Sequence, residues 1–310
     1  LITVNLCPAP AQTLKPYPPR SRRLRSTSTA GNSIVRSSDI HLPKTLAEAL
    51  EILEANPEIL PVAGGSEIVG SQYDRLIDFP ESILSIAKLR ELRKTQRTEQ
   101  FLEVGACTTM TGLLGLPKGT LPSPLGEAIR GIGNLGIRNI ATLGGNLCSR
   151  RHFMDLWPFL ASMDAQIEIR SASVSRWASV YHLADEKGLP ALPPRTLVTR
   201  IRIPLVSYNF TFFKKIGPRG IPGPENAYFV CLGSIKHGKI DMFKLIFSGA
   251  KAFRVKDLEM LLLGRKIEGP LKEIQGIAQS YKQSLEKQDW FDGRIFGGIL
   301  DECLSRLFTS

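Results

Sequence analysis

The sequence predicts an α+β fold. Short apolar runs that suit buried strands occur along the chain together with segments whose apolar residues recur at helical spacing. Two glycine-rich segments, around Gly64 and Gly144, lie eighty residues apart, and each follows a predicted strand or helix. At 310 residues, 43% apolar and 22% charged, the chain has room for two or three globular units with sizeable cores.

Organised sequence begins near Ile40. Thr45 is the expected N-cap of a helix whose apolar residues have helical spacing and which ends near Asn56 and Pro57. Residues 59–63 are short and apolar, and they predict a buried strand that runs straight into the first glycine segment. Residues 82–86 predict the next strand.

The middle of the chain continues in the same way. Residues 101–106 predict a strand, and residues 108–111 suit a helix start. The positions i, i+3, i+4 and i+7 of an amphipathic helix are occupied by Leu125, Ala128, Ile129 and Ile132. That helix is expected to lead into the second glycine segment.

The net charge of +11 is unevenly distributed. Residues 1–37 hold six of the cations and no acid, which leaves +5 for the rest of the chain. This stretch is rich in Ser, Pro and Arg and has no hydrophobic period, so a transit-like leader or a nucleic-acid arm is conceivable. We expect a disordered extension without a function of its own, and therefore no nucleic-acid partner.

Cysteine spacing and hydropathy limit the kinds of metal site, disulfide and membrane span that the chain can have. The five cysteines, Cys7, Cys107, Cys148, Cys231 and Cys303, lie far apart, without a C-x-x-C motif or a histidine at metal spacing. Neither a metal site nor a disulfide framework is expected. The sequence has no apolar run of about 18 residues, so we expect no membrane span. A soluble protein of the reducing cytoplasm fits best.

Each glycine segment suits a phosphate. A glycine pair lets the backbone approach a charged ligand, because no Cβ blocks it and a positive φ costs little. Backbone N–H groups can then cradle the anion. One such loop is more often an ordinary turn, whereas two loops that both end in small polar residues favour a nucleotide site.

A third glycine pattern belongs to another class of protein. The segment from Gly131 to Gly136 satisfies G-x-G-x-x-G, and Asp155 follows about twenty residues later, as in a Rossmann dinucleotide fingerprint. A Rossmann fingerprint follows a strand and opens a helix. Here the pattern follows a predicted helix, so an NAD-dependent Rossmann enzyme remains only the alternative.

Three segments together resemble the FAD-binding subunit of molybdenum hydroxylases, such as the FAD domain of xanthine dehydrogenase and the medium subunit of aerobic carbon monoxide dehydrogenase. They are residues 63–68, residues 105–109, and residues 137–146 with Asp155 and Leu156. Residues 197–204 and 212–215 resemble the family's passage into its C-terminal domain, as do residues 239–250 and 263–266. The resemblance covers about residues 38–310.

The resemblance implies a fold of three parts. The first two are the α/β subdomains of a PCMH-type (vanillyl-alcohol-oxidase-like) FAD-binding domain, at about 38–90 and 91–206. The third, 207–310, is an α+β domain of the carbon monoxide dehydrogenase flavoprotein type. No cysteine cluster lies between these parts, so the iron–sulfur insertion of some relatives is not expected.

The resemblance also implies which residues bind noncovalent FAD. Backbone amides of the first loop are expected around the pyrophosphate, at Pro61, Val62, Ala63, Gly64, Gly65, Ser66, Glu67 and Ile68. The second turn contributes Thr142, Gly144, Gly145 and Asn146, and Asp155 is expected on ribityl or ribose hydroxyls. Lys214 is expected near the flavin ring edge, with Ile132 and Val198 as apolar neighbours.

The residues themselves leave alternatives open. Asp155 is also a good N-cap for a helix that begins near Leu156, Thr142 suits an ordinary strand, and Lys214 suits a solvated surface. Arg150, Arg151 and His152 stand where many relatives have small residues. They suit either a diphosphate or a surface that faces solvent or a partner. The segment 188–194 is shorter than in relatives and leaves the electron-acceptor side of the flavin open.

The implied function is an electron relay inside a complex. Electrons pass from 2Fe-2S clusters on a small subunit through FAD to NAD⁺ or another acceptor. A large subunit holds molybdopterin and selects the substrate. The chain itself has no cysteine set for a cluster and is not expected to hydroxylate anything alone. A basic nucleic-acid-binding protein is a further alternative.

Overall fold

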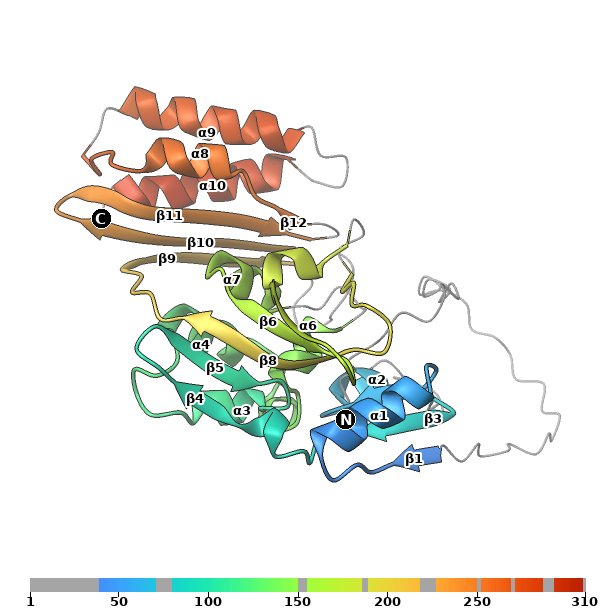
Figure 1. The fold of residues 1–310 in the computed structure, drawn as a ribbon. Helices are drawn as coiled ribbons and strands as arrows, with labels where there is room; N and C mark the ends of the chain where they lie inside the picture. The colour runs from blue at the N-terminus through green and yellow to red at the C-terminus, as the bar shows by residue number, and fades with distance from the viewer. Residues whose placement is uncertain are drawn as a thin grey trace, which may run out of the picture.

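The fold of this chain is seen in a computed structural model that describes residues 39–70, 80–149, 155–185, 189–217, 227–249, 252–268, 271–286 and 293–308. It contains three β-sheets, which follow one another along the chain (Figure 1). The expectations for residues 1–37 lie outside the described ranges. So do Arg150, Arg151 and His152, and Gly188.

The first sheet is small and parallel, in the order β1-β3-β2. Its region comprises β1 (Asp39–His41), α1 (Leu46–Ala55), β2 (Leu60–Val62), α2 (Ser66–Gly70) and β3 (Ser82–Ser85). The Thr45 hydroxyl accepts the Glu48 amide at 3.2 Å, which confirms the expected cap, and α1 ends at Ala55 with Asn56 as its C-cap, close to the expected end. Its apolar stripe is buried and packs against β3 and against the residues on either side of β2.

The second sheet is antiparallel, in the order β4-β5-β8-β6-β7. Its strands are β4 (Thr95–Arg97), β5 (Phe101–Gly105), β6 (Gln166–Arg170), β7 (Ser175–Ser179) and β8 (Leu197–Pro204). Short helices accompany it: η1 (Glu91–Arg93), α3 (Met110–Leu114), α4 (Ser123–Arg130), α5 (Leu135–Arg138), α6 (Leu143–Leu147), α7 (Trp157–Ser162) and η2 (Val180–Leu183). Strand β8 lies between β5 and β6 and therefore joins distant parts of the chain.

The third sheet has the order β12-β11-β10-β9. It comprises β9 (Phe210–Ile216), β10 (Ala227–Lys236), β11 (Lys239–Ser248) and β12 (Ala252–Phe253). Three helices, α8 (Lys256–Leu262), α9 (Leu271–Glu286) and α10 (Gly293–Phe308), cover one face, and α7 packs on the other (Figure 1). Val230, Leu232 and Ile246 therefore join the core of the middle region, which couples the third sheet to the second.

The sequence pattern placed several elements of the first two sheet regions. The strands expected near residues 59–63, 82–86 and 101–106 are confirmed. The helix expected over Leu125–Ile132 is confirmed as far as Arg130, where α4 ends; Ile132 lies beyond it, and α5 separates α4 from the second glycine segment. Within the described ranges, no helix is both long and apolar enough to cross a membrane.

Candidate cofactor site

The first glycine loop joins β2 to α2 and has two different glycines. A Cβ on Gly64 would lie 1.6 Å from the carbonyl oxygen of Ile140, so this position packs against the second loop and tolerates no side chain. Gly65 has φ +80° and is buried. Neither the Gly64 nor the Gly65 amide has a hydrogen-bond partner in the described structure. A buried N–H without a partner is rare, which suits a ligand at this loop.

The second glycine loop uses its own amides for the fold. The Leu143 amide donates to the Thr108 carbonyl at 3.0 Å, and the Gly144 amide donates to the Ala106 carbonyl at 2.8 Å. The amides of Gly145 and Asn146 both donate to Thr142, at 3.2 Å to its hydroxyl and 2.9 Å to its carbonyl. We expected both loops to offer amides to phosphate, and for the second loop that expectation is wrong. In this loop, the polar groups left for a ligand therefore belong to side chains.

Thr142 is thus the N-cap of α6 and not an ordinary strand residue. Its hydroxyl accepts from Gly145 and keeps its own proton to donate. Gly144 is required for close packing, because a Cβ there would lie 2.6 Å from that of Ala106. The loop is therefore rigidly joined to the turn after β5, at the edge that faces the first loop.

Asp155 is not the cap of α7. That cap is Leu156, which has no side-chain cap bond, and the Leu156 amide donates instead to the Asn146 side-chain oxygen at 3.0 Å. Oδ1 of Asp155 accepts from Lys215 Nζ at 2.9 Å and from the hydroxyl of Tyr228. Among the described residues, Oδ2 accepts only from the side-chain amide of Asn146, at 3.5 Å. The carboxylate therefore faces a polar cluster, with acceptor capacity left on Oδ2.

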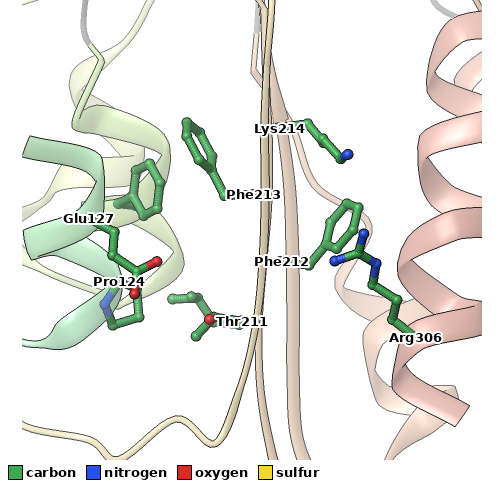
Figure 2. A pocket seen from close by; sticks show the side chains of 9 residues that line it. Pro124, Glu127, Thr211, Phe212, Phe213, Lys214 and Arg306 are labelled. Carbon is green, nitrogen blue, oxygen red and sulfur yellow. The ribbon is translucent and has the colours of Figure 1, made fainter. Parts of the chain in front are cut away.

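The lysine of this cluster is Lys215 and not Lys214. Side chains alternate along a strand, so adjacent lysines on β9 point to opposite faces. Lys214 forms an ion pair with Glu302 of α10 at 3.2 Å, and Figure 2 shows it opposite Phe213 across the strand. The expectation placed Lys214 beside the cofactor, whereas the structure brings Lys215 to Asp155; the pattern of β9 does not show which face meets the second sheet.

Ile132 and Val198 both belong to the main hydrophobic core. Val198 is fully buried on β8, and Ile132 follows α4. The structure therefore places them inside the packing behind the loops and does not bring either to the Asp155 cluster. Their expected contact with a flavin stays a prediction.

Three residues of the site region were missed from the sequence. Lys215 and Tyr228 come from β9 and β10, and burial together with the Asp155 contact raises the pKa of Tyr228. Arg138 donates through one nitrogen to the carbonyls of Ile132 and Gly133, at 2.8 and 3.0 Å. Its Nε is buried without a partner among the described residues. Side-chain alternation along β9 could have pointed to Lys215. The position of Arg138 between the two glycine motifs could have pointed to that residue.

The G-x-G-x-x-G pattern does not form a Rossmann turn. Helix α4 precedes it and the short helix α5 begins inside it, with no strand before it. The Arg138 guanidinium donates hydrogen bonds to the Ile132 and Gly133 carbonyls and so stabilises this turn. The dinucleotide alternative is therefore not supported, as the order of elements in the sequence had indicated.

A cavity of about 260 Å³ lies along the edge of β9. Pro124 and Glu127 of α4 line one side, and Phe212 and Arg306 line the other (Figure 2). Phe159 of α7 also lines the cavity. Lys214 is the one predicted cofactor residue in its lining. The glycine loops and Asp155 lie elsewhere, so this cavity is separate from the candidate cofactor site.

Comparisons with known proteins point to one family. A family described as the FAD binding domain in molybdopterin dehydrogenase matches residues 35–206. The glyceraldehyde dehydrogenase medium chain of Sulfolobus acidocaldarius is 29% identical over 233 residues, which is 74% of this chain and 82% of that protein. A putative xanthine dehydrogenase FAD-binding subunit of Escherichia coli is 34% identical over 53% of this chain and 56% of its own length.

Solved structures show the same fold. A chain of quinoline 2-oxidoreductase from Pseudomonas putida 86 superposes with a TM-score of 0.73 at 17% identity, over 88% of this chain and 96% of that one. A chain of carbon monoxide dehydrogenase from Oligotropha carboxidovorans gives 0.72 at 19% identity, over 88% and 98%. Because the family match spans more than half of the sequence, the chain belongs to the FAD-binding domain family of molybdopterin dehydrogenases. It is thus an FAD-binding oxidoreductase component.

Proposed function

We propose that the chain binds FAD noncovalently and relays electrons as one subunit of a molybdenum hydroxylase complex. The observation that carries the proposal is the amide of the buried residue Gly65, which has no hydrogen-bond partner among the described residues and lies in a left-handed turn opposite the second glycine loop. A pyrophosphate is the part of FAD that suits amides fixed in this way. No His or Cys is required to tether the cofactor.

The remaining groups of the site would orient the cofactor. Thr142 can donate its hydroxyl proton, and Asn146 fixes the backbone before α7. Asp155 is an acceptor for the vicinal hydroxyls of a sugar or ribityl chain through Oδ2, while Lys215 and Tyr228 hold its other oxygen. Lys215 therefore replaces Lys214 in the proposed set.

FAD supplies the exchange between one-electron donors and two-electron acceptors when it is bound. The proposed donors are 2Fe-2S clusters on a small subunit, and a molybdopterin-binding large subunit oxidises the substrate. NAD⁺ or another acceptor receives the electrons. The names of the relatives, a medium chain and FAD subunits, support this division of labour. A cytoplasmic location accords with such a complex.

The domain division is part of the proposal. Each sheet falls within one expected unit, the first in 38–90, the second in 91–206 and the third in 207–310. The Asp155 cluster joins the last two units. Residues 1–37 remain an expected extension.

A spectrum of the purified full-length chain tests the cofactor. We expect flavin absorbance in the native protein, and complete release of the yellow colour into the supernatant on acid precipitation. Flavin retained in the pellet would contradict noncovalent binding. A colourless protein that cannot take up added FAD would contradict the proposed function itself.

A further inference from the structure

A ten-residue segment holds most of the excess charge of the folded chain. Residues 88–97, called here the cationic segment, contain Lys88, Arg90, Arg93, Lys94 and Arg97 and the single acid Glu91, a net +4. The whole chain beyond residue 37 has only +5. The positive charge outside the N-terminal extension is therefore concentrated at one place on the surface.

The five cations are available to a partner. All are exposed, and none forms an ion pair within the described chain. The one acid of the segment is engaged, because Glu91 accepts the Leu46 amide at 3.0 Å at the start of α1. That hydrogen bond also lowers the pKa of Glu91, so its charge is committed to the fold. Arg97 reaches only the Gly119 carbonyl, at 3.4 Å.

Protection of a sheet edge explains only part of this charge. Strand β4 is an edge of the second sheet, and cations on an edge discourage pairing with other chains. Lys94 and Arg97 flank or occupy β4, but Lys88, Arg90 and Arg93 precede it in the connection through η1. These three need another explanation.

The backbone of the segment is fixed to the candidate cofactor site. The Cys107 amide donates to the Leu92 carbonyl at 2.7 Å, and the Gly105 amide donates to the Lys94 carbonyl at 2.9 Å. A Cβ on Gly105 would lie 2.3 Å from the Leu92 carbonyl oxygen, so the contact is tight. The next residue, Ala106, accepts the Gly144 amide of the second loop. The cations thus stand on a rigid support next to that loop.

We propose that the cationic segment docks an acidic face of the iron–sulfur subunit that delivers electrons to this chain. The proposal rests on the proposed function. Its own evidence is the unpaired charge and the short hydrogen-bonded connection to the second glycine loop. Single-stranded nucleic acid is the less suitable occupant, because the segment has no aromatic side chain on which a base could stack.

Charge complementarity of this kind acts mainly on the rate at which two proteins associate. It raises association rates about 10- to 1000-fold at low salt and loses effect as salt screens the charges. We therefore expect fast, strongly salt-dependent association with the iron–sulfur subunit.

The test uses the full-length chain with a double charge reversal, Arg90→Glu with Arg93→Glu. The matched control is Lys239→Glu with Lys266→Glu, which makes the same charge change at two exposed, unpaired lysines of the third sheet region. The probe is the iron–sulfur subunit isolated from the complex that copurifies with the tagged wild-type chain. Association rates are measured between about 25 and 500 mM salt, a range that spans weak to strong screening. Flavin content and melting temperature are recorded for each variant.

Reversal at Arg90 and Arg93 should lower the low-salt association rate constant by at least about tenfold and flatten its salt dependence. The control should stay within about twofold, as expected for charges outside the contact. Carbodiimide cross-linking of the wild-type complex should join Lys88 or Lys94 to Asp or Glu of the subunit.

Equal rates for wild type and the Arg90/Arg93 variant, with flavin present and the complex formed, would overturn the docking proposal alone. So would loss of oligonucleotide binding in that variant with unchanged subunit binding. A flavin-containing wild-type chain that copurifies with no iron–sulfur subunit would overturn both proposals.

Discussion

The hydroxyl of Tyr228 donates a hydrogen bond to the carboxylate of Asp155. Tyr228 lies on β10 and is 3% exposed, whereas Asp155 precedes α7. The bond therefore joins the third sheet to the acid that we expect on cofactor hydroxyls. It also leaves Oδ2 as the oxygen with acceptor capacity, since Oδ1 is shared by Tyr228 and Lys215.

Tyr228→Phe tests whether this bond positions Asp155. We expect FAD affinity to fall by about 1 kcal/mol, the usual net value of one hydrogen bond, because the carboxylate loses one of its two anchors on Oδ1. Asp155→Asn should cost about 1.5–3 kcal/mol, as for a hydrogen bond to a charged group. FAD titrations of both single variants and the double variant measure the coupling.

The two effects should not add, because Tyr228 acts through Asp155. Additive losses would show that Tyr228 affects FAD independently of Asp155. Wild-type FAD affinity in Asp155→Asn would show that this carboxylate serves only to join the two sheets.

Lys214 and Lys215 provide a matched pair. Lys215→Met removes the cation 2.9 Å from Asp155 and should weaken FAD binding several-fold. Lys214→Met removes the cation paired with Glu302 on the opposite face of β9, and FAD affinity should stay unchanged. Titration under identical salt measures both. The reverse order of effects would return the role to Lys214 and contradict the orientation of β9.

Substitution of the two glycines of the first loop should have different effects, on FAD affinity at Gly65 and on apo stability at Gly64. Gly65→Val places a β-branched residue at φ +80°, which costs about 1–2 kcal/mol of apo stability, and it blocks the approach of phosphate to the buried amide. FAD affinity should collapse in a protein that still folds. Unchanged affinity in folded Gly65→Val would mean that the loop is only a turn.

Gly64→Ala should instead damage the fold. Its Cβ would lie 1.6 Å from the Ile140 carbonyl oxygen, so the two loops must separate. Overpacking typically costs about 1–3 kcal/mol, and here backbone has to move. Thermal melts of the apo proteins compare the two variants. An apo Gly64→Ala protein as stable as wild type would contradict the packing of the loops.

Glu168 on β6 should make the fold sensitive to acid. Burial opposes its charge, but hydrogen bonds from Arg200, Thr199 and Ser175 outweigh burial and lower its pKa from 4.5 to about 2. Because the folded pKa lies below the unfolded one, Glu168 stabilises the fold above about pH 4.5 and loses this contribution as pH falls toward 2. Urea unfolding of wild type and Glu168→Gln measures it.

Glu168→Gln should be less stable at neutral pH by about 1.5–3 kcal/mol. The difference should shrink between about pH 4.5 and pH 2, where the wild-type carboxylate takes up a proton. A difference that is constant across this range would contradict the lowered pKa.

Local pattern was enough to place the glycine loops and several elements of the first two sheet regions. Thr45 caps α1 because a hydroxyl three residues before Glu48 satisfies a helix N–H that otherwise has no partner. β2 leads into the first loop because an apolar run followed by glycine specifies a buried strand and a sharp turn. The rejection of the Rossmann pattern also followed from local order, since a helix and not a strand precedes Gly131.

The chemistry of the site depended on contacts between distant residues. The second loop looks like a phosphate loop, yet two of its amides donate to the Ala106 and Thr108 carbonyls, some 35 residues earlier in the chain. Two others donate to Thr142. Asp155 suits a cap in sequence, but Lys215 and Tyr228, 60 and 73 residues later, take its carboxylate. Alternation along β9 determined that adjacent lysines oppose each other. Only packing of the third sheet against α7 decided that Lys215 faces Asp155, because burial of a face is a property of the assembled layers.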